Sequence, residues 1–115
     1  MTLQEMFDKA YIGLASQHFE QCYSELADSC LYSDGEGKHC AWGWVDLSLG
    51  REILNLTVRE LNQMNMGIAA TLDEEQLDFA SKLQIAHDNS SEYFPMENLL
   101  YDLARQYNLT IPKID

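Results

Sequence analysis

The feature that most constrains this chain is the spacing of its apolar residues, which recur every three or four positions in several separate stretches. The first stretch covers about residues 3–17, and its apolar positions share one side of a helix: Leu3, Met6, Phe7, Ala10, Tyr11, Leu14 and Ala15. Thr2 and Glu5 open it with the spacing of a capping box, in which each side chain bonds the other residue's backbone N–H. The pattern predicts an amphipathic helix whose apolar stripe enters the core.

Three more helices are predicted in the second half of the chain, over about residues 57–67, 71–89 and 95–108. Capping-box pairs precede the first two of them: Thr57 with Glu60, and Thr71 with Glu74. The third begins at Pro95, a residue whose fixed φ suits the first turn of a helix. Each segment carries apolar residues at helical spacing, so each is expected to bury one face.

A turn signal separates the first helix from this helical half. Asp34-Gly35-Glu36-Gly37 stands between two short apolar runs, and glycine supplies the positive φ that tight turns need. We therefore expect one small β-hairpin near residues 30–42. The run from Ala41 to Leu49 is too apolar to be exposed, and is either a buried helix or irregular core. Its Trp42-Gly43-Trp44 triplet is interpreted as core packing, with ligand stacking as the alternative.

These elements predict a single compact domain over residues 1–115, of mainly α (α+β) class, with four to five short helices and one small β-hairpin. A chain of 115 residues is too short for two independent cores, and 46% hydrophobic residues exclude disorder. No apolar run reaches the roughly 18–20 residues that cross a bilayer. The first residues lack a basic region followed by an apolar stretch, so we expect no signal peptide and a cytoplasmic location.

The cysteines Cys22, Cys30 and Cys40 are expected to be reduced, because an odd number without an export signal does not build a disulfide framework. The residue types that could bind a metal form one candidate group: Cys30, His39, Cys40, His87 and Asp88. Their spacing is poor for structural zinc, which favours close pairs such as C-x2-C. We expect no metal and no cofactor. A small metal-dependent or thiol hydrolase that uses this group is the alternative function.

Charge is the strongest compositional signal, since 19 Asp and Glu face seven Lys and Arg, for a net charge of −12. Such a surface repels nucleic acids and anionic membranes, and is attracted to basic surfaces, including the nucleic-acid-binding grooves of other proteins. Solubility explains the same charge without any partner. A dense group of carboxylates on the predicted helix 71–89 is our candidate for a partner-binding acidic face: Asp73, Glu74, Glu75 and Asp78.

Two motifs resemble those of a family of small uncharacterised phage and bacterial proteins. Cys30-Leu31-Tyr32 followed by Gly37-Lys38-His39-Cys40-Ala41-Trp42-Gly43 is similar to C-x-Y…G-x-x-C-A-x-G, and Leu83-Gln84-Ile85-Ala86-His87-Asp88 is similar to L-Q-x-x-H-D. The resemblance covers residues 30–109. It implies no activity, but it implies a setting among the accessory proteins of phages and mobile elements, which commonly inhibit host defences.

Charge and resemblance together lead us to expect a non-enzymatic inhibitor. Its acidic face would occupy the basic nucleic-acid-binding surface of a host protein, as an anti-CRISPR or anti-restriction protein in the host cytoplasm. We expect no direct contact with nucleic acid or with a membrane. The oligomeric state stays open, and a homo-oligomer that buries Trp42 or Trp44 is a third interpretation.

Overall fold

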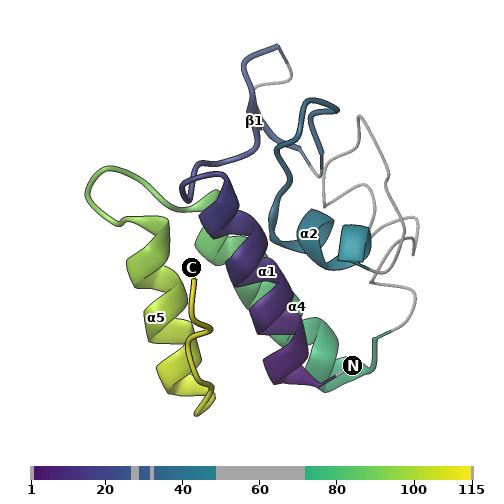
Figure 1. The fold of residues 1–115 in the computed structure, drawn as a ribbon, viewed down its shortest axis with the longest axis vertical. Helices are drawn as coiled ribbons and strands as arrows, with labels where there is room; N and C mark the ends of the chain where they lie inside the picture. Colours follow the sequence, from purple (N-terminus) through teal and green to yellow (C-terminus); the bar gives the residue numbers. More distant parts are fainter. Residues whose placement is uncertain (1, 27–28, 32, 49–71, 115) are drawn as a thin grey trace.

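The computed structural model describes residues 2–26, 29–31, 33–48 and 72–114, and Figure 1 shows their arrangement. The helices are α1 (Leu3–Ser16), α2 (Ala41–Ser48), α4 (Glu74–Asp88) and α5 (Met96–Gln106), and the strands are β1 (Tyr23–Ser24) and β2 (Ser29–Cys30). The fold is mainly α, as the sequence predicts. The helix predicted over residues 57–67 lies outside the described residues. Within the described ranges, no helix is long and apolar enough to cross a membrane.

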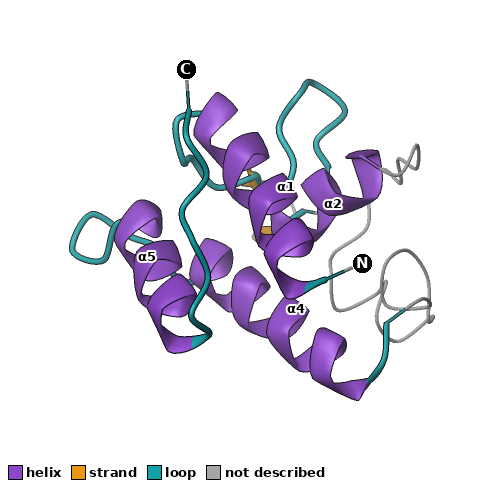
Figure 2. Cartoon of the chain, turned by 60° about the horizontal axis from the view of Figure 1, so that its bottom comes forward, coloured by secondary structure: helices purple, strands orange, loops and turns teal. Residues whose placement is uncertain are grey.

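The core lies where these four helices meet. α1 packs against both α2 and α4, and α5 packs against α4. Figure 2 shows α4 running beneath α1 and α2, with α5 to one side. Fully buried side chains from all four helices fill the space between them: Met6, Phe7, Leu14, Val45, Phe79, Leu83 and Leu100. The apolar stripes that the sequence places at helical spacing therefore face one another.

α1 begins and ends with local hydrogen bonds. The Thr2 hydroxyl accepts the N–H of Glu5 at 3.1 Å, and the Glu5 carboxylate accepts the N–H of Thr2 at 3.0 Å, which confirms the predicted capping box. At the other end the N–H of Phe19 donates to the carbonyl of Leu14 at 2.8 Å, and His18 and Phe19 have φ of 59° and 55°. This left-handed turn ends the helix, and the segment that follows it bonds the C-terminal end of α4 through Gln21 and Cys22.

The N-cap of α4 is Asp73, so Glu74 is the first residue of the helix and not the third, as the predicted capping box requires; its other member, Thr71, lies outside the described residues. The Asp73 carboxylate accepts the N–H of Gln76 at 2.8 Å, and the Gln76 side chain accepts the N–H of Asp73 at 3.0 Å. A carboxylate caps a helix as well as a hydroxyl does. Asp73 and Gln76 have the same three-residue spacing as the predicted pair and lie two residues later in the chain. α4 ends one residue before Asn89, close to the predicted end.

α5 is bounded by the two residues that the sequence indicates. Pro95 immediately precedes it, and Asn108 adopts the left-handed conformation just beyond its end, with φ of 56°. The C-terminal tail then returns to α1. The Gln4 side chain donates to the carbonyl of Thr110 at 3.0 Å and accepts the N–H of the same residue at 2.9 Å.

The hairpin predicted near residues 30–42 is shorter than expected. The chain does turn there, with positive φ at Gly35 (75°) and Gly37 (105°). However, a single isolated bridge, between Ser33 and His39, joins the arms in the described structure. The second arm is short because α2 begins two residues after this bridge. The antiparallel pairing of β1 with β2 lies earlier in the chain.

The two tryptophans of α2 pack inward. Trp42 is 2% exposed, and its indole N–H donates to the carbonyl of Ala80 at 2.7 Å. Trp44 lies so close to Gly13 of α1 that a Cβ at that glycine would overlap the indole ring. The indole N–H of Trp44 donates to Gln17 at 3.0 Å. Residues 41–48 are therefore a buried helix, and the alternative of irregular core is wrong.

Candidate functional site

The predicted acidic face lies at the N-terminal end of α4, and all four of its carboxylates belong to exposed residues: Asp73, Glu74, Glu75 and Asp78. An open hollow of about 640 Å³ on this surface is lined by Glu74, Glu75, Leu77, Asp78 and Ser81. The structure thus brings the four carboxylates to one end of the helix. Their contacts differ, and the differences decide which of them can serve a partner.

Two of the four carboxylates support the fold. Asp73 caps α4, and loss of such a cap costs about 1 kcal/mol of stability. Asp78 forms an ion pair with Lys82 at 3.3 Å, and Tyr107 bonds Asp78 at 3.4 Å and Lys82 at 2.8 Å. The bond to Tyr107, followed by the bond to Asp78, raises the pKa of the Lys82 ammonium. Lys82 therefore stays charged and offsets part of the charge of Asp78.

Glu74 and Glu75 are the two charges that remain available to a partner. Neither forms an ion pair with a cation among the described residues. Both lie in the first turn of α4, where the helix dipole favours anions. Reversing either charge should cost only about 0.3–1 kcal/mol of stability, so these two positions allow binding to be tested without unfolding the chain.

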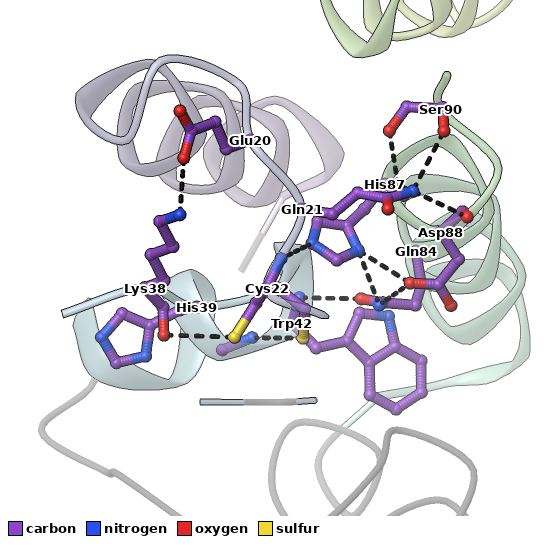
Figure 3. Close-up of polar contacts among 12 residues, drawn as sticks. Glu20, Gln21, Cys22, Lys38, His39, Trp42, Gln84, His87, Asp88 and Ser90 are labelled. Carbon is purple, nitrogen blue, oxygen red and sulfur yellow. Dashed lines mark hydrogen bonds and ion pairs between the residues drawn. The ribbon is translucent and has the colours of Figure 1, made fainter. Parts of the chain in front are cut away.

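A second cluster of polar contacts lies at the other end of α4, around the fully buried His87 (Figure 3). The backbone N–H of Cys22 donates to His87 Nε2 at 3.0 Å. Because a peptide N–H can only donate, Nε2 must accept, and the ring proton is on Nδ1. Nδ1 donates to the Asp88 carboxylate at 2.7 Å. Both ring nitrogens of His87 are therefore used inside the protein.

Neighbouring side chains complete this cluster. The Asp88 carboxylate accepts the side-chain amide of Gln84 at 2.8 Å, and it also bonds the Cys30 thiol. The side-chain nitrogen of Gln21 lies 2.9–3.1 Å from three carbonyl oxygens at the end of α4 and just beyond it, which share its two N–H groups. These carbonyls have no partners within a helix, so Gln21 acts as a C-terminal cap supplied by a distant part of the chain. The cluster fixes the segment after α1 to the end of α4.

The candidate metal-binding residues divide into two groups. Cys30, His87 and Asp88 each place one donor atom within 4.8 Å of the others, whereas His39 and Cys40 lie outside this triad. A metal on His87 Nδ1 would displace the Nδ1 proton while Nε2 still accepts a backbone N–H, which leaves the ring anionic. The triad therefore fits a metal ion poorly and is better described as a hydrogen-bonded cluster.

The thiols lie in surroundings that oppose ionisation. Burial is the largest cause in each case, and raises the pKa of Cys22 to about 11 and that of Cys30 to about 12. The nearby Asp88 charge adds to the shift at Cys30. Burial also raises the pKa of Cys40, which is completely enclosed. A nucleophilic thiol needs a lowered pKa and access to a substrate, so these cysteines give no support to a thiol hydrolase.

The raised thiol pKa values predict a loss of stability at alkaline pH. An unfolded thiol ionises near its ordinary pKa of 9.0, whereas Cys22 keeps its proton in the folded protein up to about pH 11. Between these values the unfolded state binds fewer protons, so the stabilisation present below pH 9 is lost as pH rises. The expected slope is about 1.4 kcal/mol per pH unit for each buried thiol.

Urea unfolding at a series of pH values from 8 to about 10.5 measures this slope. The variant Cys22→Ala should start from a lower stability at neutral pH but decline less steeply, because one titrating thiol is gone. Equal slopes for the two proteins would mean that the Cys22 thiol has the same pKa in the folded and in the unfolded state, which would contradict the prediction.

Sequence reasoning missed the side chains that hold these sites in place. Gln84 falls on the apolar side of α4 in phase with Ala80, and a polar residue at a core position could have indicated a buried network. Gln17 and Gln21 gave no comparable signal, since they lie at a helix end and in a loop. The adjacent aromatic residues Tyr93 and Phe94 were also passed over, although they stand in an otherwise polar loop.

Comparison of the chain with protein-family models, with curated proteins and with solved structures gave no match. The resemblance to small phage and bacterial proteins therefore stays a prediction from two motifs.

Proposed function

We propose that this chain is a non-enzymatic inhibitor that binds the basic nucleic-acid-binding surface of a host protein through the acidic end of α4. The proposed class is that of anti-CRISPR or anti-restriction proteins encoded by phages and mobile elements. One observation carries the proposal. Glu74 and Glu75 stand exposed beside an open hollow, and no described cation forms an ion pair with either.

Electrostatics supports this kind of partner. A groove that binds nucleic acid presents Lys and Arg to the negatively charged phosphates. A chain of net charge −12 can present negatively charged carboxylates to the same groove. Opposite charge on the two surfaces accelerates encounter, and the effect weakens as salt screens it. The contact is therefore expected to be strong at low ionic strength and sensitive to added salt.

The arrangement around His87 favours this proposal over the hydrolase alternative. Both ring nitrogens of His87 already bond protein groups, so the imidazole has no nitrogen left to act as a base. The thiols are protonated at neutral pH for the reasons given above. The chemistry of this cluster serves to hold the fold together.

The test is capture of partners from a bacterial host lysate by the tagged protein at low and at high salt. The variant Glu74→Lys/Glu75→Lys changes the surface charge by four units and keeps the Asp73 cap. We expect a nucleic-acid-handling protein to be captured at low salt, to be released at high salt, and to be lost at least tenfold in the variant.

The matched control is Glu25→Lys/Glu36→Lys, which makes the same charge change at exposed positions between β1 and β2 and on the turn before α2. It should capture the same partner within about twofold, because screening removes most of the effect of distant charges. Equal loss in both variants would mean that net charge, and not the end of α4, determines binding.

A further inference from the structure

The loop between α4 and α5 exposes two aromatic side chains that the fold does not use. Tyr93 is 86% exposed and Phe94 is 65% exposed. Isolated exposed apolar residues are common, but an adjacent exposed pair presents a larger apolar area to water. Tyr residues are also enriched among the side chains that dominate binding energy at protein interfaces.

The loop is held in one shape by hydrogen bonds at its base. The N–H of Ser91 donates to the carbonyl of Phe94 at 2.9 Å, and the N–H of Phe94 donates to the Ser91 hydroxyl at 3.1 Å. Ser90 is tied to the end of α4 by its hydroxyl, which donates to the carbonyl of His87 at 2.9 Å, and to Gln21 through its own carbonyl. The rings therefore project from a pre-ordered turn, which lowers the entropy cost of binding.

Carboxylates stand on both sides of the two rings in the sequence. Glu92 and Glu97 flank them in sequence, both are exposed, and neither forms an ion pair with a cation in the described segments. Both also line a hollow of about 500 Å³ beside the loop, together with His18 and Glu20, and the two rings stand outside its lining. The loop thus presents two exposed rings next to a hollow that carries exposed carboxylates.

This combination matches the chemistry of one side chain. The planar guanidinium of arginine stacks on aromatic rings and donates two parallel hydrogen bonds to a carboxylate, whereas the lysine ammonium acts as a point charge. We propose that Glu92, Tyr93, Phe94 and Glu97, named here the loop surface, bind arginine side chains of a protein partner. The inference rests on the proposed function for the identity of that partner, which is a basic protein.

The loop surface is distinct from the acidic end of α4. α4 has 15 residues, or roughly 22 Å at the helical rise per residue. Glu74 and Glu75 lie at its first turn, and the loop surface follows its last turn. A partner that contacts both would be held at two points, by charge at one end and by arginine recognition at the other.

The test compares two synthetic peptides, of alternating glycine with arginine and of alternating glycine with lysine, equal in length and charge. Binding of each to the full chain is measured by fluorescence anisotropy near physiological salt. We expect the arginine peptide to bind about fivefold to tenfold more tightly, because stacking on exposed rings favours arginine. Amide NMR signals of residues 90–97 should shift in the arginine titration.

Removal of the rings should abolish this preference. In Tyr93→Ala/Phe94→Ala the ratio of the two affinities should fall to about one, while affinity for the lysine peptide stays unchanged. The control Ile85→Ala/Ile114→Ala removes two other half-exposed apolar side chains and should keep the preference. Because all four residues are exposed, every variant should unfold at nearly the wild-type temperature. A preference that survives in the ring variant would overturn the inference.

The two proposals can fail separately. Glu74→Lys/Glu75→Lys should weaken both peptides alike and leave their ratio intact. Arginine preference located at the loop surface, with no nucleic-acid-handling protein captured from lysate, would support the inference and contradict the proposed function. A captured partner whose binding depends on Glu74 and Glu75, with no arginine preference in the peptides, would support the proposed function and contradict the inference about the loop surface.

Discussion

Replacement of Gln17 by leucine is expected to destabilise the protein by about 3–5 kcal/mol, or to prevent folding. Gln17 is 8% exposed, and both the oxygen and the nitrogen of its carboxamide form hydrogen bonds. Its oxygen accepts the N–H of His39 and the indole N–H of Trp44, each at 3.0 Å. Its nitrogen donates to the carbonyls of Glu20 at 2.7 Å and of His39 at 2.9 Å. Leucine fills a similar volume but makes none of these four bonds.

Gln4 provides the matched control, because it also makes several side-chain hydrogen bonds but lies near the surface. Gln4→Leu removes the two bonds to Thr110 and one to Asp8, and water can replace each of them. We expect a loss of less than about 1 kcal/mol. Chemical denaturation of both variants measures the difference. Similar losses at the two positions would show that burial of the Gln17 network does not determine its contribution.

Gly13→Ala is the second large effect, and its sign is the informative part. In an ordinary helix interior, alanine is more stable than glycine by about 0.5–1 kcal/mol. At this position the added Cβ would overlap the ring of Trp44, which is fixed by its bond to Gln17. The ring must move to make room, so we expect a net loss of about 2 kcal/mol.

A change of background separates this overlap from any other effect of alanine. In a chain that carries Trp44→Leu, the indole ring is absent, and Gly13→Ala should then be neutral or stabilising. Thermal unfolding of the four proteins of this cycle gives the coupling free energy between the two positions. An equal loss in both backgrounds would mean that the helices do not approach one another at Gly13.

The parts of the fold that could be predicted are those encoded by local patterns. The stripe of α1, its capping box and the boundaries of α5 depend on residues a few positions apart, and sequence spacing shows them directly. The hairpin near residues 30–42 was overestimated, since the turn signal of Gly35 does not reveal that α2 begins soon after it. The cap of α4 was misplaced by two residues because the segment offers overlapping pairs with the same spacing.

The contacts that join distant segments could not be predicted in this way. The hydrogen bond from the backbone N–H of Cys22 to His87 Nε2 joins residues that are 65 positions apart in the sequence. Only the folded chain brings them together. The candidate metal-binding residues also show what sequence cannot predict. Sequence supplied the residue types of the Cys30, His87 and Asp88 triad, but only the geometry shows that the ring nitrogens are already engaged. Charge, in contrast, is visible in sequence, although the ion pair that offsets Asp78 is not.

In the function we propose, the acidic end of α4 and the loop surface are two chemically different contacts for one basic partner. The first depends on the charge of Glu74 and Glu75, and should vary steeply with salt. The second depends on Tyr93 and Phe94, and should persist where charge is screened. Inhibition of nucleic-acid binding requires that at least one of these contacts overlap the path of the nucleic acid on the partner.

The most direct measurement is competition between this protein and nucleic acid for the captured partner. The partner is loaded with a fluorescent nucleic acid that it binds, and this protein is then titrated in at fixed salt. We predict displacement of the nucleic acid to completion by the wild-type protein, and at least tenfold weaker displacement by Glu74→Lys/Glu75→Lys, with the Glu25→Lys/Glu36→Lys control unimpaired. A stable ternary complex, in which partner, nucleic acid and this protein are bound together, would contradict the account.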